Sequence, residues 1–301
     1  MRPASGVVKR KNYHILCLFF RADAIYPVWS QSSFRVTRRP APILRDGNTS
    51  KINRLESPDS ALPEVEPWRP LAVARVSAIA EILLCSGIPS QLALAYMFTL
   101  AGFSPMVGGK LSFAYIATLL LLDATLLIAL IFWLIRRRGE HPRDVFLGQR
   151  PAGSEVQLGV WLTAVVFSLA VIVLSAARYF FPSLHNVKEN PLQDLIQTPV
   201  QAFLLAIVAT ISGGLREEIQ RAFIIHRFEQ YLGGAHVGLI LYSLVFGLGH
   251  SLQGFDAVLT TALLGAFWGW IYISRRSIIA PVVSHSGFNA AEIFVFLVSR
   301  R

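Results

Sequence analysis

The feature that most constrains this chain is a set of uninterrupted apolar runs, the clearest being residues 111–135, LSFAYIATLLLLDATLLIALIFWLI. A helix needs about 20 predominantly apolar residues to cross the roughly 30 Å hydrocarbon core of a bilayer. This run and the run at 158–181 are both long enough. The composition agrees, because 53% of the 301 residues are hydrophobic and only 15% are charged. We therefore expect an integral membrane protein that has the lipid bilayer as its solvent.

Counted by length, the apolar segments predict an all-α, polytopic membrane protein with about seven transmembrane helices. The first segment contains Gly87 and Pro89, which disfavour a straight helix, so it should bend. No internal repeat of the inverted kind found in many transporters is evident. The expected spans are 73–103, 111–135, 158–181, 199–222, 235–251, 255–273 and 278–298.

The first seventy residues differ from the rest of the chain. They hold twelve Lys or Arg and six Asp or Glu, with scattered prolines and no helical period. Such a stretch cannot bury enough apolar surface to offset the entropy lost on ordering. The sequence thus predicts two parts, a disordered basic N-terminal tail over 1–70 and a transmembrane domain over 71–301.

The formal net charge of +10 reflects topology rather than a nucleic-acid partner, because the basic groups lie in flanks and connections. The arginine-rich connection 136–150, RRRGEHPRDVFLGQR, should be cytoplasmic by the positive-inside rule. Alternation of the spans then places the N-terminus and the connection 223–234 in the cytoplasm too. His226 and Arg227 should face that interface, and Trp268, further on, fits an aromatic belt.

Paired carboxylates interrupt the fourth apolar segment in GGLREEIQRAFIIHRF, residues 213–228. An ionisable side chain at the centre of a spanning helix costs about 2.5–3.5 kcal/mol. Arg221 follows Glu217 by four residues and Glu218 by three, so one arginine can reach both carboxylates on a helix. Taken alone, this motif is most simply interpreted as a structural ion pair.

Two further polar groups lie in the fifth and seventh segments, FGLGH from Phe246 to His250 and HSGFN from His285 to Asn289. A spacing of four places the first and last residue of each group on one helical face. A single histidine in such a place is more often a hydrogen-bonded packing residue than a catalyst. Two histidines, an asparagine and two carboxylates on three segments indicate a shared polar site.

Hydrolysis is the chemistry that these residue types can perform together. A glutamate can act as general base toward water, and an imidazole can orient that water or protonate a leaving amine. An asparagine amide can donate to the oxyanion of a tetrahedral intermediate. Alternatively, the histidines and a glutamate could bind a divalent metal such as zinc. Both schemes use the same residues, and the zincin and serine-hydrolase motifs H-E-x-x-H and G-x-S-x-G do not occur in the chain.

The order EE…R, F-x-x-x-H and H-x-x-x-N on successive segments resembles the CAAX prenyl protease and bacteriocin-processing family, also called the abortive-infection family. The resemblance covers about residues 195–298. It implies an all-helical fold with a polar cavity inside the bilayer, in which a glutamate and two histidines activate water to cut a peptide bond. The implied substrate is a membrane-associated peptide or protein, prenylated or not.

The resemblance also implies a role for each site residue. By this resemblance, Glu217 would be the water-activating carboxylate, and His250 and His285 would be the imidazoles. Asn289 would be the transition-state donor, and Glu218 with Arg221 would be the supporting pair.

One departure concerns the arginine. The usual pattern is EE-x-x-x-R, whereas EEIQRA has Ala222 at the arginine position and Arg221 one place earlier. This shift turns the guanidinium by about 100° around the helix axis.

The depths of the site residues raise a second question. Glu217 falls near the cytoplasmic end of the fourth segment. His250 lies about 22 Å from Ala235 along the fifth segment, at a helical rise of 1.5 Å per residue. For the two to meet, either the fourth helix continues beyond residue 222 or the fifth begins in the cytoplasm.

The leading hypothesis is an intramembrane endopeptidase that opens to the cytoplasm. One alternative is a non-catalytic membrane protein of the same fold, such as a bacteriocin-immunity or assembly factor. Another is a proton-coupled transporter, in which Glu81, Asp123 and the histidines would form a relay. Glu81 and Asp123 lie outside the motifs that carry the resemblance, and each is expected to find a proton or a hydrogen-bond partner inside the bundle.

Overall fold

The computed structural model describes residues 71–299 except residue 189. The predicted N-terminal tail lies outside the described residues. Within the described residues, one short hairpin, β1 (Met106–Val107) with β2 (Lys110–Leu111), lies between helices. The helices are α1 (Leu71–Leu84), α2 (Ile88–Leu100), α3 (Phe113–Arg137), α4 (Pro142–Phe146), α5 (Ala152–Phe180), α6 (Pro199–Ala209), α7 (Glu217–Tyr231), α8 (Ala235–Leu248), α9 (Phe255–Arg275) and α10 (Ile279–Ser299).

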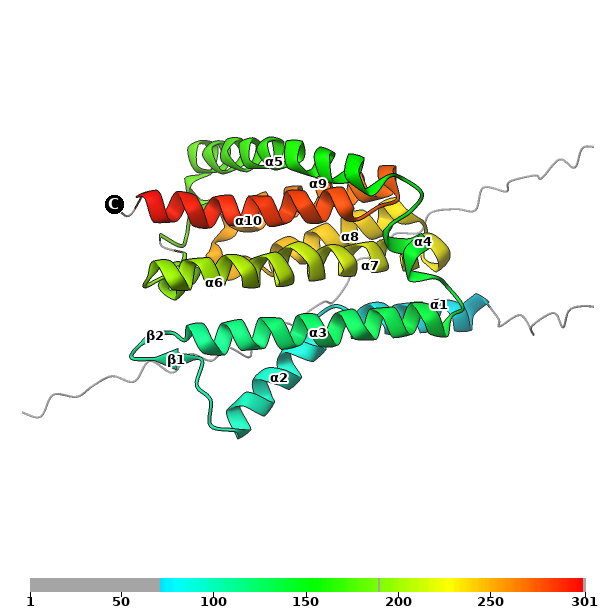
Figure 1. Ribbon diagram of the computed structural model, residues 1–301, viewed down its shortest axis with the longest axis horizontal. Helices are drawn as coiled ribbons and strands as arrows, with labels where there is room; N and C mark the ends of the chain where they lie inside the picture. The colour runs from blue at the N-terminus through cyan, green and yellow to red at the C-terminus, as the bar shows by residue number, and fades with distance from the viewer. Residues whose placement is uncertain (1–70, 189, 300–301) are drawn as a thin grey trace, which may run out of the picture. The chain divides into compact units, whose positions relative to one another are not determined.

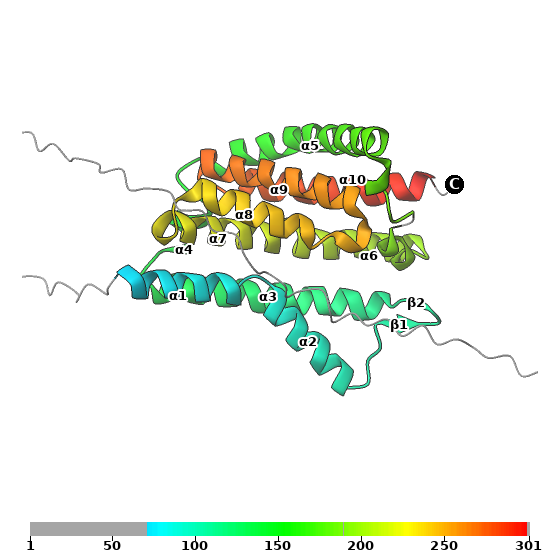
Figure 2. The ribbon, with the colours of Figure 1, turned by 180° about the vertical axis from the view of Figure 1, so that it is seen from behind.

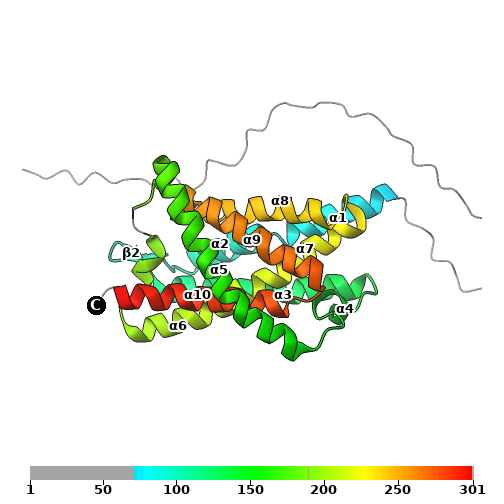
Figure 3. The same cartoon turned by 90° about the horizontal axis from the view of Figure 1, so that it is seen from above.

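Helices α6 and α7 form one rod at the centre of the bundle. A π-helical segment, Thr210–Arg216, joins them. Figures 1 and 2 show this rod from opposite sides, with α3 along one flank and α10 along the other. The view from above in Figure 3 shows α5 crossing over α9 and α10. The central rod therefore contacts both the N-terminal and the C-terminal helices.

Among the described residues, five helices are long and apolar enough to cross a membrane, and the bent pair α1–α2 makes a sixth if it is counted as one span. The expected count of about seven is not confirmed. The segment predicted over 235–251 forms α8, a helix of only 14 residues, which is shorter than the roughly 20 residues that a span requires. The N-terminal orientation stays a prediction.

The fourth apolar segment forms a longer helix than predicted. The expected span 199–222 is the start of a continuous helix of 33 residues, Pro199–Tyr231. It begins where the Thr198 hydroxyl accepts the Gln201 N–H in a capping box. The expected cytoplasmic connection 223–234 is therefore mostly helical, because α7 continues to Tyr231. The fourth helix therefore continues beyond residue 222, which is one of the two arrangements expected to let Glu217 and His250 approach each other.

The predicted bend in the first segment is confirmed. Gly87, with φ of +84°, separates α1 from α2, and the two helices are bent by 41°. A left-handed φ is accessible to glycine without steric cost. Pro89 lies in the first turn of α2, where a backbone N–H has no intrahelical hydrogen-bond acceptor, so the missing N–H of proline costs no helical hydrogen bond.

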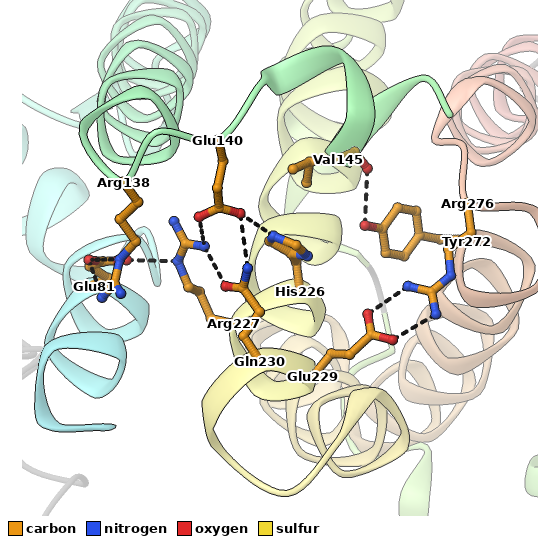
Figure 4. Close-up of polar contacts among 10 residues, drawn as sticks. All are labelled: Glu81, Arg138, Glu140, Val145, His226, Arg227, Glu229, Gln230, Tyr272 and Arg276. Carbon is orange, nitrogen blue, oxygen red and sulfur yellow. Dashed lines mark hydrogen bonds and ion pairs between the residues drawn. The ribbon is translucent and has the colours of Figure 1, made fainter. Parts of the chain in front are cut away.

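A network of ion pairs joins α1, α7 and the chain after α3 (Figure 4). Arg227 is fully buried and donates to Glu81 at 2.8 Å and to Glu140 at 2.6 Å. Arg138 also pairs with Glu81, and His226 contacts Glu140. The expectation that Arg227 faces the interface is wrong, because two carboxylates cover it.

The carboxyl of Glu140 lies outside the spanning helices. Its partial burial would raise its pKa, but the hydrogen bonds and charges of His226 and Arg227 outweigh this effect and lower the pKa to about 2. A lowered carboxyl pKa stabilises the folded state above the unfolded value of about 4.3. This contribution is lost as the pH falls toward 2.

Close packing of α5 on α10 depends on Gly159. A Cβ at this position would lie 2.6 Å from the Val283 Cβ and 2.8 Å from the Ala280 carbonyl oxygen. Neither atom is the far end of a flexible chain, so the helices would have to move apart. A Cβ at Gly153, six residues earlier on α5, would meet no atom within 4 Å, so this position offers a matched control.

We expect Gly159→Ala to destabilise the protein by about 1–3 kcal/mol, the usual cost of overpacking. Gly153→Ala should leave the stability unchanged or raise it slightly, because alanine favours the helix. Thermal unfolding of both variants in the same detergent measures the difference. Equal melting temperatures would contradict the proposed packing.

Candidate active site

The paired glutamates open α7 directly after the π-helical segment, and they have different environments. Successive residues on a helix point about 100° apart. The Glu218 side chain is 1% exposed, whereas that of Glu217 is 22% exposed. One carboxylate is therefore enclosed by protein, and the other remains accessible.

Glu218 pairs with Arg221, whose guanidinium is fully buried. Arg221 Nη1 donates to Glu218 Oε1. The guanidinium carbon lies 4.7–5.6 Å from the ring centroids of Tyr242, Phe246 and Trp268. An enclosed charge needs such compensation from a carboxylate and from aromatic faces. The shifted arginine thus forms a short-range pair with the second glutamate.

His285 of α10 meets both carboxylates. Its Nδ1 lies 2.8 Å from Glu218 Oε1, and its Nε2 lies 3.8 Å from Glu217 Oε2. A carboxylate only accepts, so Nδ1 carries a hydrogen and the neutral ring presents the Nε2 lone pair toward Glu217. The imidazole stacks on Trp268, with ring centroids 3.9 Å apart. These contacts specify both the tautomer and the orientation of the ring.

His250 follows the end of α8 and is tied to the same region through Phe246. Its Nδ1 lies 2.9 Å from the Phe246 carbonyl oxygen, which can only accept, so Nε2 is again left free in the neutral ring. The Phe246 ring centroid lies 5.0 Å from the ring centroid of His250 and 6.3 Å from that of His285. Phe246 is therefore shared by the two histidines.

Asn289 lies one turn beyond His285 on α10 and faces the π-helical segment. Its Nδ2 donates to the Ala209 carbonyl at 3.3 Å. A Cβ at Gly213 would lie 2.5 Å from this nitrogen, and one at Gly214 would overlap the Ser286 hydroxyl. The two glycines thus let α10 approach the central rod closely.

The structure brings four of the predicted site residues into direct contact or near contact: Glu217, Glu218, Arg221 and His285. His250 joins them through Phe246, while Asn289 contacts the helix backbone nearby. A cavity lined by these residues stays a prediction.

Sequence reasoning missed Trp268, which it assigned to an aromatic belt. The side chain is almost fully buried, and its indole N–H donates to the Ser284 hydroxyl at 3.2 Å. Its role as a stacking surface for His285 depends on how α9 and α10 pack. No motif in the sequence around Trp268 signals that contact.

The donors left free for a metal are the Glu217 carboxylate and the Nε2 atoms of His250 and His285. Within the part of the chain that the structure describes, no three or more His, Cys, Asp or Glu side chains are grouped so that they could hold a metal ion. Glu218 is already engaged by Arg221 and His285. The arrangement therefore does not fit a metal centre.

Comparison with known protein families gives a match to a protease family. Residues 199–291 match the family model described as Type II CAAX prenyl endopeptidase Rce1-like. The matched region runs from α6 into α10 and contains all of the predicted site residues. Neither the curated proteins nor the solved structures gave a significant match.

The two glutamates should differ in their effect on stability. Glu218→Gln leaves the buried Arg221 guanidinium without its counter-charge, and we expect a loss of about 3–5 kcal/mol. Glu217→Gln removes a more exposed charge and should cost less than about 1 kcal/mol. Thermal unfolding of the two variants in detergent compares them directly. Similar losses for both would show that Glu218 is not the structural partner.

Proposed function

We propose that this chain is an active intramembrane endopeptidase. The premise is that the chain belongs, through residues 199–291, to the Rce1-like type II CAAX prenyl endopeptidase family. In this proposal the chain hydrolyses a peptide bond in a membrane-associated substrate, with a water molecule as the nucleophile.

The observation that carries the proposal is the unequal engagement of the two glutamates. Glu218 is enclosed and bonded to Arg221 and His285. Glu217 is partly exposed and faces His285 Nε2 across 3.8 Å, a distance too long for a direct hydrogen bond. A water molecule at this point can donate one hydrogen to Glu217 and the other to Nε2. These are the contacts that a general base and its orienting partner require.

The proposed reaction then follows in two proton transfers. Glu217 takes a proton as the water oxygen attacks the peptide carbonyl carbon, and the resulting oxyanion accepts a hydrogen bond from Asn289. The C–N bond breaks as the proton held by Glu217 passes through an imidazole to the leaving nitrogen, a relay for which His250 and His285 each have a free Nε2. The products are an amine and a carboxylic acid that ionises by releasing its proton to water, and the enzyme regains its starting state.

Glu218 and Arg221 support this chemistry without contacting the substrate. The Glu218 carboxylate holds the hydrogen of His285 on Nδ1, which keeps the Nε2 lone pair toward Glu217. Arg221 balances the charge of Glu218 inside the bundle. The displaced arginine of the EEIQRA sequence is thus compatible with activity, because it needs to reach only the second glutamate.

Two alternatives remain testable. A non-catalytic protein of the same fold would retain the polar cluster as structure alone. A proton-coupled transporter would need Asp123 and Glu81 to exchange protons, but Asp123 pairs with Arg216, and Glu81 pairs with Arg138 and Arg227. A relay would have to break these pairs at each step, which disfavours the transporter.

The first test is cleavage of a fluorescence-quenched C-terminal peptide by the purified protein in vesicles, with prenylated and unprenylated versions compared. Glu217→Gln keeps the shape of the side chain but removes the base, so turnover should fall by about 10²–10⁴-fold. Glu218→Gln should give a smaller loss at a temperature at which it stays folded. Wild-type turnover in Glu217→Gln would falsify the role given to this residue.

A second test concerns metal. Because the free donors do not form a metal centre, we expect turnover to be unchanged after prolonged incubation with a strong chelator. Elemental analysis of the same preparation checks that no zinc remains bound. Loss of activity that added zinc restores would instead assign the histidines and Glu217 as metal ligands.

A further inference from the structure

A buried ion pair between Asp123 and Arg216 lies outside the residues assigned to catalysis. Asp123 is 1% exposed near the middle of α3, and Arg216 Nη2 donates to its Oδ2 at 2.6 Å. Ser90 and Gln91 of α2 also donate to this carboxylate, at 2.5 and 3.2 Å. A carboxylate in a spanning helix is costly unless it is paired and hydrogen-bonded. The pair therefore ties α2 and α3 to the central rod.

Arg216 also fills the break in the first span. A Cβ at Gly87 would overlap the guanidinium, so only glycine leaves room for it. Arg216 Nη1 donates to Gln220 Oε1 at 3.0 Å, and Gln220 Nε2 donates to the Cys85 carbonyl at 2.7 Å. The carbonyl end of α1 is thus satisfied by α7. The Arg216 side chain is thus bonded to Asp123 of α3 and Gln220 of α7, and it lies against the break between α1 and α2.

Arg216 directly precedes Glu217, and this adjacency couples the pair to the proposed base. Residues that follow one another on a helix point about 100° apart. Fixing Arg216 toward α3 therefore fixes the direction in which Glu217 leaves the helix. Arg216 is also the last residue of the π-helical segment. A π-helical turn locally widens the helix, and its position sets the rotation, about the helix axis, of the α-helical turn that follows. The ion pair thereby specifies the rotation at which α7 begins.

We infer that Asp123 is a positioning residue for Glu217, acting through Arg216. The inference rests on the proposed catalytic role of Glu217. Asp123 lies outside residues 199–291, so the N-terminal helices contribute to the site although the family match does not include them. Asp123 itself touches neither the substrate nor the reacting water.

The test is Asp123→Asn, which keeps the shape of the side chain but removes the charge that holds Arg216. We expect kcat to fall by about 10- to 100-fold, as a displacement of about 1 Å can cause, with KM unchanged. Asp123→Glu, which keeps the charge, should restore part of the loss. Wild-type kcat in Asp123→Asn would overturn the inference.

The matched control is Asp256→Asn. Asp256 of α9 is as buried as Asp123 and also pairs with an arginine, Arg178, but its carboxylate bonds to Arg178, His185 and the Ala257 N–H rather than to Arg216 or a catalytic residue. This variant should lose stability and keep its kcat. An equal fall in kcat for both variants would reduce Asp123 to a general structural role and contradict the inference.

A readout that needs no activity separates this inference from the proposed function. Glu217→Cys is made in a chain in which Cys17 and Cys85 are serine, and the rate of maleimide reaction with the new thiol is measured. Adding Asp123→Asn should change this rate severalfold, whereas adding Asp256→Asn should not. If the rate responds while the wild type cleaves no peptide, the positioning stands and the proposed function fails. An unresponsive rate overturns the positioning.

If Asp123→Asn does not accumulate in the membrane, Arg216→Lys provides the second variant. Lysine keeps the positive charge but lacks the planar fork that contacts Asp123 and Gln220 together. The same fall in kcat and the same change in thiol reactivity are expected. Unchanged values of both would count against the inference.

Discussion

The central helix carries several charged side chains among apolar helices, and the rest of the structure depends on how those charges are compensated. An uncompensated buried charge costs several kcal/mol, and removing one partner of a buried pair typically costs about 3–5 kcal/mol. Because successive residues turn by about 100°, Arg216 meets Asp123 of α3, whereas Glu218 meets His285 of α10. Compensation of these charges thus binds the two flanks of the bundle to one rod.

Pairing also distinguishes the two glutamates. Arg221 and His285 together occupy the carboxylate of Glu218, and aromatic rings enclose the guanidinium. Glu217 has no such partner at hydrogen-bonding distance within the described residues. A buried ion pair contributes little to net stability compared with an apolar contact of the same volume. Its effect here is geometric, because it holds one imidazole in a single tautomer beside a free carboxylate.

Much of the fold could be predicted from the chain. Long apolar runs required spanning helices, Gly87 and Pro89 required a bend, and the spacing of Glu218 and Arg221 allowed their ion pair. The predictions failed where a local signal was ambiguous. The fourth span was expected to end at residue 222, but the helix that begins at Pro199 continues to Tyr231. A run of apolar residues likewise could not reveal that α8 is only 14 residues long.

The sequence by itself determined that the chain lies in a bilayer, which polar residues interrupt its apolar helices, and which of them share a helical face. Those properties follow from composition and from the 3.6-residue period of a helix. Only the tertiary structure decided that Trp268 stacks on His285, that Arg227 is enclosed by two carboxylates, and that Asp123 holds Arg216. These contacts join residues far apart in the chain, so they depend on how the helices pack, which no local pattern specifies.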